Sequence, residues 1–260
     1  MRLLMMHIYR PLMKWMQVKG RTDMKIVAVI PARYGSSRFP GKPLADIAGK
    51  TMIERIYGQV ANCPHIDDVL VATDNREIFD AAKGFGAHSV MTSPDCPSGS
   101  DRVAEAVSGM DVDGVVNIQG DQVILDKVAL MELVDQLRQG CPMVTIATAM
   151  PGDEMNDPNS VKVVIGINGF ALYFSRSPIP YVRNPGHSSL LKHIGIYGFS
   201  RETLYNYTNL EPSPLEKTES LEQLRALESG IPIKVIVAHG EFFEINTPQD
   251  RERLLKTWQD

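Results

Sequence analysis

The segment from Ile30 to Leu44, IPARYGSSRFPGKPL, gathers residue types that bind polyphosphates. Gly35 and Gly41 allow the backbone to approach a ligand closely, and the N–H groups of such a loop form a concave site for anions. Arginine donates forked hydrogen bonds to phosphate oxygens, whereas lysine acts as a compact point charge. Three such cations lie in this segment: Arg33, Arg38 and Lys42. The segment therefore predicts a polyphosphate loop, with a solvated basic surface turn as the alternative.

The spacing in this loop excludes two common phosphate-binding motifs. A P-loop would need Ser or Thr after its lysine, but Pro43 follows Lys42, and no GxGxxG pattern is present. The apolar segment 24–31 before the loop predicts a strand, and ligand loops of open α/β sheets follow the carboxyl ends of strands. This position favours the polyphosphate loop over the surface turn.

A carboxylate is expected at the same edge of the sheet. Residues 114–118, GVVNI, predict a strand, and Asp121 follows it within QGDQ. A carboxylate beside a triphosphate implies Mg²⁺, which proteins hold with one or two carboxylates together with phosphate oxygens and water. Alternatively, Asp121 caps the turn, which is a common use of aspartate. The spacing alone leaves both interpretations open.

The segment 93–102, SPDCPSGSDR, combines turn residues with the start of a helix. Its hydroxyl and amide groups could bind the edge of a base. Capping of the helix by Ser98 or Ser100 is the structural alternative, and the two roles are compatible.

Short apolar runs alternate with helical patterns along the chain, which predicts an α/β fold with a mostly parallel central sheet, helices on both faces and a smaller mixed β subdomain. Further strands are expected at 69–73, 89–92, 143–150, 161–165, 169–175, 193–199, 233–237 and 241–246. Helices are expected at 51–60, 76–86, 98–107 and 127–138. Two more are expected after the strand at 193–199, one of them over 219–228, and a last helix from Thr247 onward. Asn168-Gly169 predicts a hairpin turn between two of these strands. We expect a single domain over 24–260, with nucleotide binding mainly in 24–150 and sugar binding and dimerisation mainly in 151–245.

Composition limits the class of protein. The 260 residues are 43% hydrophobic and 22% charged, enough for a sizeable core, and the net charge of -4 argues against a general nucleic-acid binder. Three cysteines without a CxxC pair predict neither a disulfide framework nor a zinc site, which fits a reducing cytoplasm. Residues 1–23 lack the apolar length of a membrane span and the pattern of a signal peptide, so we expect a poorly ordered extension and no membrane association.

Seven segments together resemble the 3-deoxy-manno-octulosonate (Kdo) cytidylyltransferase family, also called CMP-Kdo synthetases. They occur in unbroken order from about residue 25 to the C-terminus: IPARYGSSRFPGKPL, VATD, MTSPDCPSGSDR, NIQGD, ALYFSRSPIPY, KHIGIYGF and ESLEQLRALE. The resemblance implies a nucleotidyltransferase fold, usually a homodimer. It also implies Mg²⁺-dependent joining of CTP and Kdo into CMP-Kdo with release of pyrophosphate, the activation of Kdo for lipopolysaccharide synthesis.

The same resemblance implies roles for individual residues. Catalysis would fall to Arg33, Lys42 and Asp121. The nucleotide would be bound by Ala32, Arg33, Lys42, Ser98, Gly99 and Arg102. The sugar acid would be contacted by Gln119, Arg176, His193, Tyr197, Glu222 and Gln223. The metal would be held by Asp121 and by Asn246.

Two positions depart from the family pattern. The family usually reads VDTPED near its C-terminus, with the aspartate as a second metal ligand, whereas this chain reads INTPQD and has Asn246 there. Glu244 lies two positions earlier, on the same strand face, and is a candidate substitute. QGDQV also replaces the usual QGDEP, and some relatives that activate the 8-amino analogue of Kdo share the glutamine found here at Gln122.

These departures leave alternatives open. The substrate could be 8-amino-Kdo or another acidic sugar, or the chain could be a CTP-binding paralogue with a weakened metal site.

Overall fold

The computed structural model describes residues 21, 23–35, 38–184 and 190–258. The predicted extension, residues 1–23, therefore lies outside the described residues except for Arg21 and Asp23. The chain divides into two compact units, which we describe separately. The first unit comprises Lys25–Met131 and the segment from Gly240 onward, and the second comprises Glu132–His239 with the described residues before 25.

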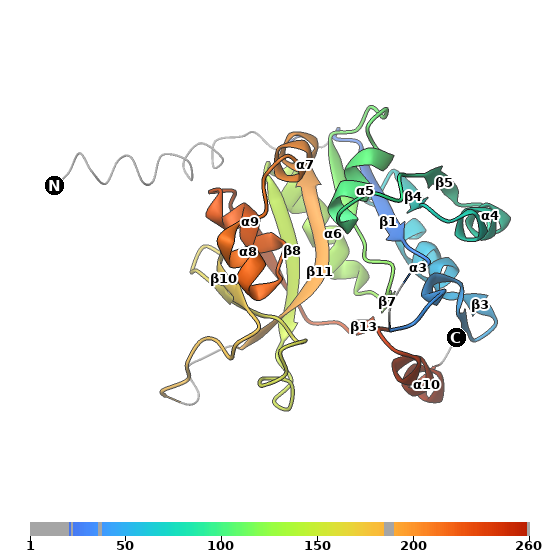
Figure 1. The fold of residues 1–260 in the computed structure, drawn as a ribbon. Coiled ribbons are helices and arrows are strands. Elements are labelled where there is room, and N and C mark those ends of the chain that lie inside the picture. The colour runs from blue at the N-terminus through green and yellow to red at the C-terminus, as the bar shows by residue number, and fades with distance from the viewer. Residues whose placement is uncertain (1–20, 22, 36–37, 185–189, 259–260) are drawn as a thin grey trace. The chain divides into compact units, whose positions relative to one another are not determined.

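The first unit is built on four parallel strands in the order β6-β1-β4-β5. Their bounds are β1 (Ile26–Ala32), β4 (Asp68–Thr73), β5 (His88–Met91) and β6 (Gly114–Asn117). Every residue of β1 is buried, as expected for a central strand that is covered on both faces. The predicted parallel sheet is confirmed (Figure 1).

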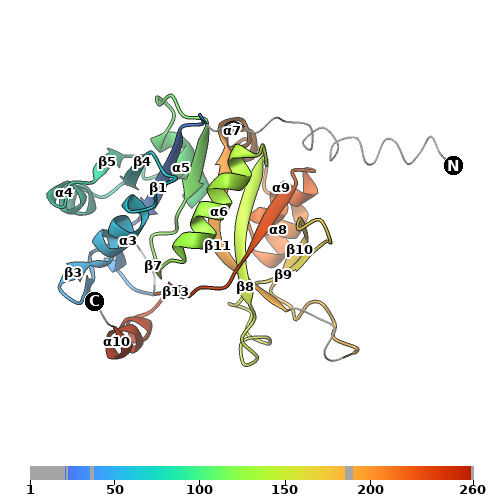
Figure 2. The same cartoon turned by 180° about the vertical axis from the view of Figure 1, so that it is seen from behind.

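Several helices of the first unit begin at capping side chains. The helices are η1 (Lys42–Leu44), α3 (Met52–Ala61), α4 (Arg76–Gly84), α5 (Gly99–Ala106) and α10 (Pro248–Thr257), and α6 (Lys127–Arg138) begins in this unit. Ser98 caps α5 and Thr247 caps α10, each in a reciprocal pair with an aspartate three residues later. In the two opposite views, α5 lies in front of β1 in Figure 1 and α3 in front of it in Figure 2.

Two small antiparallel pairs complete the first unit. They are β2 (Asp46–Ile47) with β3 (Lys50–Thr51), and β7 (Gln122–Ile124) with β13 (Phe243–Glu244). The second pair brings the C-terminal segment beside the QGDQ turn, where the backbone N–H of Ile245 donates to the carbonyl of Asp121 at 3.0 Å. A strand was expected over 241–246, and only its centre is paired.

The second unit carries a mixed sheet in the order β10-β9-β11-β8-β12, in which only β8 and β12 are parallel. The bounds are β8 (Met143–Ala149), β9 (Lys162–Ile165), β10 (Ala171–Ser175), β11 (Leu191–Ser200) and β12 (Ile233–Ala238). The predicted hairpin between β9 and β10 is confirmed, with Gly169 at a φ of 75°. Gly198 lies beneath α6, where a Cβ would come within 2.6 Å of the Leu133 side chain.

The prediction of one helix over 219–228 is wrong. The structure has α7 (Arg201–Thr208), α8 (Pro214–Glu219) and a separate α9 (Gln223–Glu228). Ser220 interrupts the helix because its φ of 51° lies in the left-handed region. The Arg176 guanidinium donates to the carbonyls of Glu219 and Ser220, which holds the interruption in place.

The predicted α/β class is confirmed: the first unit supplies the parallel strands and the second unit the mixed β section. Within the described part of the chain, no helix combines the length and apolar character needed to cross a membrane.

Candidate functional site

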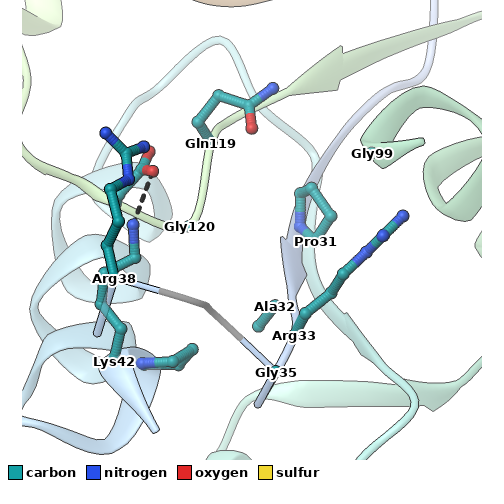
Figure 3. Close-up of a pocket in the computed structure, with 11 residues that line it drawn as sticks. Pro31, Ala32, Arg33, Gly35, Arg38, Lys42, Gly99, Gln119 and Gly120 are labelled. Carbon is teal, nitrogen blue, oxygen red and sulfur yellow. Dashed lines mark hydrogen bonds and ion pairs between the residues drawn. The ribbon is translucent and has the colours of Figure 1, made fainter. Parts of the chain in front are cut away.

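A pocket of about 350 Å³ opens in the first unit at the carboxyl ends of β1 and β6 (Figure 3). This is the edge of the sheet at which open α/β folds bind ligands. The pocket is lined by Pro31, Ala32, Arg33, Gly35, Arg38, Lys42, Pro43, Gly99, Gln119, Gly120 and Asp121. The residues predicted for the polyphosphate loop and for the QGDQ turn therefore share one cavity.

Two glycines shape this cavity. Gly41 adopts a φ of 68°, and its N–H donates to the carbonyl of Tyr34 at 3.0 Å, which closes the loop and places Lys42 at the start of η1. At Gly120, a Cβ would lie 2.6 Å from the carbonyl oxygen of Pro31, closer than real Cβ contacts allow. The QGDQ turn can therefore pack against the end of β1 only with glycine at position 120.

Lys42 and Asp121 form an ion pair at the floor of the pocket. The ammonium Nζ lies 2.8 Å from the Asp121 carboxylate, and the two side chains are 13% and 21% exposed. Figure 3 shows this pair as the dashed line beneath Arg38. The fold thus brings together two residues that are 79 positions apart in the sequence.

The two arginines of the loop have different partners. Arg33 donates to the carbonyl of Cys96 at 2.8 Å, which links the polyphosphate loop to the segment before α5. Arg38 donates to Oδ1 of Asn246 at 3.3 Å. Both side chains are largely exposed and line the pocket, so with Lys42 and Asp121 the pocket holds three cations and one carboxylate. This excess of positive charge suits a polyanionic ligand.

Of the residues predicted to surround the base and ribose, only Gly99 lines the pocket beside Ala32. Ser98 caps α5. Arg102 is fully buried and donates to Asp74 at 2.7 Å and to Thr92, so it ties α5 to the end of β4. The role of Arg102 in nucleotide binding stays a prediction, and the observed contacts are those of a structural ion pair.

The donors available for a metal in this pocket are few. Asp121 lines it, while the Asn246 amide oxygen accepts from Arg38. Glu244 is exposed on β13, opposite Gln122, and does not line the pocket. Among the described residues no group of three or more His, Cys, Asp or Glu could hold a metal alone. One carboxylate fits Mg²⁺ only when phosphate oxygens complete the coordination, as is usual for this ion.

The remaining predicted substrate residues, apart from Gln119, belong to the second unit. The donors of Arg176 are used by backbone carbonyl groups. Its guanidinium donates to the carbonyls of Pro158, Glu219 and Ser220 at 2.8, 2.7 and 3.1 Å. The Glu219 carboxylate in turn accepts from the N–H of Arg176 and the hydroxyl of Ser175, and these bonds hold the pKa of Glu219 below its usual value. Arg176 therefore fixes the turn that leads to Glu222.

His193 and Tyr197 lie together on β11, with ring centroids 5.4 Å apart. Phe174 contacts the His193 ring edge-on at 4.9 Å. Desolvation lowers the pKa of His193 to about 3 and raises that of Tyr197, so both rings are neutral near pH 7. These side chains can exchange hydrogen bonds with a sugar but contribute no charge.

Glu222 and Gln223 are adjacent, at the start of α9. The Glu222 carbonyl accepts from the hydroxyl of Tyr207 at 2.9 Å. Gln223 is only 4% exposed, and its Nε2 has no hydrogen-bond partner among the described residues. A buried donor without a partner is costly, which is consistent with a ligand or water bound beside it.

Sequence reasoning missed the parts played by Pro31, Gly120 and Asp74. Gly120 was detectable, because a glycine between two polar residues after a buried strand indicates close backbone approach. Asp74 was detectable as an acidic residue at the carboxyl end of a strand, but nothing in the sequence identified Arg102 as its partner.

Comparisons with known proteins agree with this geometry. The cytidylyltransferase family model matches residues 27–236. A 3-deoxy-manno-octulosonate cytidylyltransferase from Myxococcus xanthus is 46% identical over 233 residues, covering 88% of this chain and 95% of that protein. An 8-amino-3,8-dideoxy-manno-octulosonate cytidylyltransferase from Shewanella pealeana is 43% identical over 234 residues, covering 87% of this chain and 96% of that protein.

A solved structure resembles the whole described fold. CMP:2-keto-3-deoxy-manno-octonic acid synthetase, complexed with CTP, matches with a TM-score of 0.85 and 41% identity. The match covers 90% of this chain and 98% of that one.

Proposed function

This chain belongs to the 3-deoxy-manno-octulosonate cytidylyltransferase family, and on that premise we propose that it transfers the cytidylyl group of CTP to the anomeric hydroxyl of Kdo. The products are CMP-Kdo, which serves lipopolysaccharide biosynthesis, and pyrophosphate. The observation that carries the proposal is the cationic pocket of the first unit, in which Lys42 and Asp121 meet at 2.8 Å.

Attack of the sugar hydroxyl on the α-phosphate needs no covalent nucleophile from the protein. Catalysis of such a displacement consists mainly of positioning and of neutralising charge on the phosphates. Lys42 and Arg33 are the cations placed to bind the triphosphate and the leaving pyrophosphate. Gly120 and Gly99 let the backbone approach the nucleotide, and Gln119, whose amide lies 3.9 Å from the position of a Cβ at Gly99, would orient it and the sugar acid.

The donor set fits Mg²⁺ in the presence of CTP. Asp121 would supply one carboxylate ligand and the phosphates the others, so the bound ion would neutralise charge on the reacting phosphates. Lys42 contacts only Oδ2 of Asp121, and the triphosphate would offer its ammonium further partners. The Asn246 amide is free to ligate the ion once Arg38 turns to phosphate, although it brings no charge.

The sugar acid would be bound by residues of the second unit, namely Arg176, His193, Tyr197, Glu222 and Gln223. The unpartnered Nε2 of Gln223 and the ring of His193 support this assignment, because both retain unused hydrogen-bonding capacity. Arg176 would act through the turn it holds, since its donors are engaged by carbonyl groups.

The 8-amino sugar is the second candidate substrate, favoured by the relative from Shewanella pealeana and by Gln122. The Gln122 side chain is 4% exposed and donates to the carbonyl of Ile124 at 3.1 Å. It is therefore turned away from the pocket, and its presence is weak support for an altered substrate.

The oligomeric state and the cellular location are further parts of the proposal. A homodimer is supported by large apolar side chains that stand exposed in the second unit: Ile167, Leu172 and Tyr181. A cytoplasmic location is supported by the free thiols of the described cysteines, Cys63, Cys96 and Cys141. Sedimentation of the purified protein tests the first proposal directly.

The decisive experiment measures pyrophosphate release from CTP and Mg²⁺ with Kdo, 8-amino-Kdo or sialic acid as acceptor. We expect turnover with Kdo that exceeds both other acceptors and disappears when Mg²⁺ is chelated. A higher rate with 8-amino-Kdo than with Kdo would identify 8-amino-Kdo as the substrate. Binding of CTP without turnover on any acceptor would indicate the inactive paralogue.

A further inference from the structure

Strand β11 carries an irregularity beside His193. Its register against β8 runs from Ile194 opposite Ile146 to Tyr197 opposite Thr145, so Gly195 and Ile196 have no opposing residues. Such bulges bend a strand and change the direction of its side chains, and they are frequent near functional sites. The carbonyl groups within the bulge lose their ladder partners and need others.

Thr145 supplies those partners. It is fully buried, and its Oγ1 lies 2.8 Å from the carbonyl oxygen of Ile196 and 3.3 Å from that of Ile194. The same Oγ1 lies 3.0 Å from Nε2 of His193. One hydroxyl thus joins both sides of the bulge to the imidazole.

The single hydroxyl proton of Thr145 determines the tautomer of the His193 ring. A hydroxyl has one proton to donate, and carbonyl oxygens can only accept, so the proton of Oγ1 is used on the bulge. Toward His193 the hydroxyl can then only accept, which requires a proton on Nε2. The ring is neutral near pH 7, because desolvation lowers its pKa to about 3, so Nδ1 carries no proton. No described residue hydrogen-bonds to Nδ1.

We propose that Thr145 is a positioning residue for His193, which fixes the Nε2–H tautomer and leaves Nδ1 as a hydrogen-bond acceptor for a hydroxyl group of the sugar acid. Phe174 and Tyr197 hold the ring plane, while Thr145 determines which nitrogen carries the proton. The link to the sugar rests on the proposed function, whereas the tautomer does not.

The first test needs no substrate. Nitrogen-15 spectra of the imidazoles, with His193 assigned by loss of its signals in His193→Gln, report which ring nitrogen is protonated in the full chain. We expect a protonated Nε2 and an unprotonated Nδ1 near pH 7. A protonated Nδ1, or a doubly protonated ring, would overturn the proposal.

The second test uses a matched pair of variants. Thr145→Val removes the hydroxyl at similar volume, and Thr145→Ser keeps it. With Thr145→Val we expect mixed tautomers and a KM for Kdo raised about 5- to 10-fold, the worth of one hydrogen bond, with the KM for CTP within about 2-fold of wild type. Thr145→Ser should restore both the spectrum and the KM.

The outcomes distinguish the positioning role of Thr145 from the proposed function. An unchanged spectrum in a folded Thr145→Val would refute the positioning role, and equal changes in both KM values would show a general structural defect. If Thr145→Val does not fold, the wild-type spectrum still tests the predicted tautomer. The KM of Thr145→Ser for Kdo still tests whether a hydroxyl at this position is sufficient. Absence of turnover in the wild type would refute the proposed function and leave the spectral result standing.

Discussion

The two units differ in the chemistry of the side chains predicted to bind the substrates. The pocket of the first unit is bounded by exposed or half-buried charges: Arg33, Arg38, Lys42 and Asp121. In the second unit, His193 and Tyr197 are desolvated and neutral, and the Arg176 guanidinium is bound to backbone carbonyls. A polyphosphate needs mobile countercharge, whereas a polyhydroxylated sugar needs hydrogen-bonding groups held at defined angles. Four predictions test this contrast.

The largest effect is expected at Lys42. Lys42→Met keeps the length of the side chain and removes its charge, which should lower kcat/KM for CTP by about 100- to 1000-fold, the usual cost of losing one charge-stabilising donor. Steady-state pyrophosphate release measures it. Lys50→Met is the matched control, because the Lys50 side chain is 55% exposed and pairs with Glu54 at 3.5 Å on the surface. A loss below about 5-fold at Lys42 would show that its charge is not used.

The ion pair between Asp74 and the buried Arg102 should matter for stability. Asp74→Asn leaves the fully buried Arg102 guanidinium without a countercharge, which should lower the free energy of unfolding by about 3 kcal/mol. Asp80→Asn is the control, since the Asp80 pair with Arg76 is exposed and worth about 0.5 kcal/mol or less. Urea unfolding gives both values. Equal effects for the two variants would contradict a structural role for Arg102.

The sequence predicted the pocket better than the second unit. Gly, Arg and Lys in a loop after a buried strand favour an anion-binding site at the carboxyl ends of the strands. The proximity of Lys42 and Asp121 could therefore be anticipated from the strand order. The break at Ser220 could not, because it depends on Arg176, more than forty positions away in the sequence, bonding to carbonyls of the turn. The bulge in β11 and the burial of Arg102 are likewise products of tertiary contacts. Local patterns do not encode such partners.

The desolvated state of His193 predicts a pH dependence of stability confined to the second unit. The folded-state pKa is about 3 and the unfolded value is 6.5. Between these values the unfolded chain binds the additional proton, so stability falls as pH decreases from 6.5 toward 3. The contribution is on the order of 1 kcal/mol per pH unit.

Urea unfolding at several pH values tests this dependence. His193→Gln should flatten the acid side of the stability profile, whereas His239→Gln, at an exposed histidine of the same unit, should leave it unchanged. Identical slopes for wild type and His193→Gln would mean that His193 is solvated, which would remove the contrast between the two units.

The smallest effect concerns the charge that this chain lacks at the proposed Mg²⁺ site. Asn246→Asp should lower the Mg²⁺ concentration for half-maximal rate several-fold, because an added carboxylate attracts the ion by on the order of a few kcal/mol before relaxation. Arg38 works against the gain, since it already donates to Asn246 at 3.3 Å and would pair more tightly with an aspartate. Glu244→Gln is the control, because Glu244 is exposed on β13 and does not line the pocket.

Together, the two variants test which residue is the second protein ligand of the proposed Mg²⁺. A lower Mg²⁺ requirement in Asn246→Asp with no change in Glu244→Gln places position 246 beside the ion. A raised requirement in Glu244→Gln would instead identify Glu244 as the ligand that compensates for asparagine. An unchanged or raised Mg²⁺ requirement in Asn246→Asp would refute the placement of position 246 at the ion.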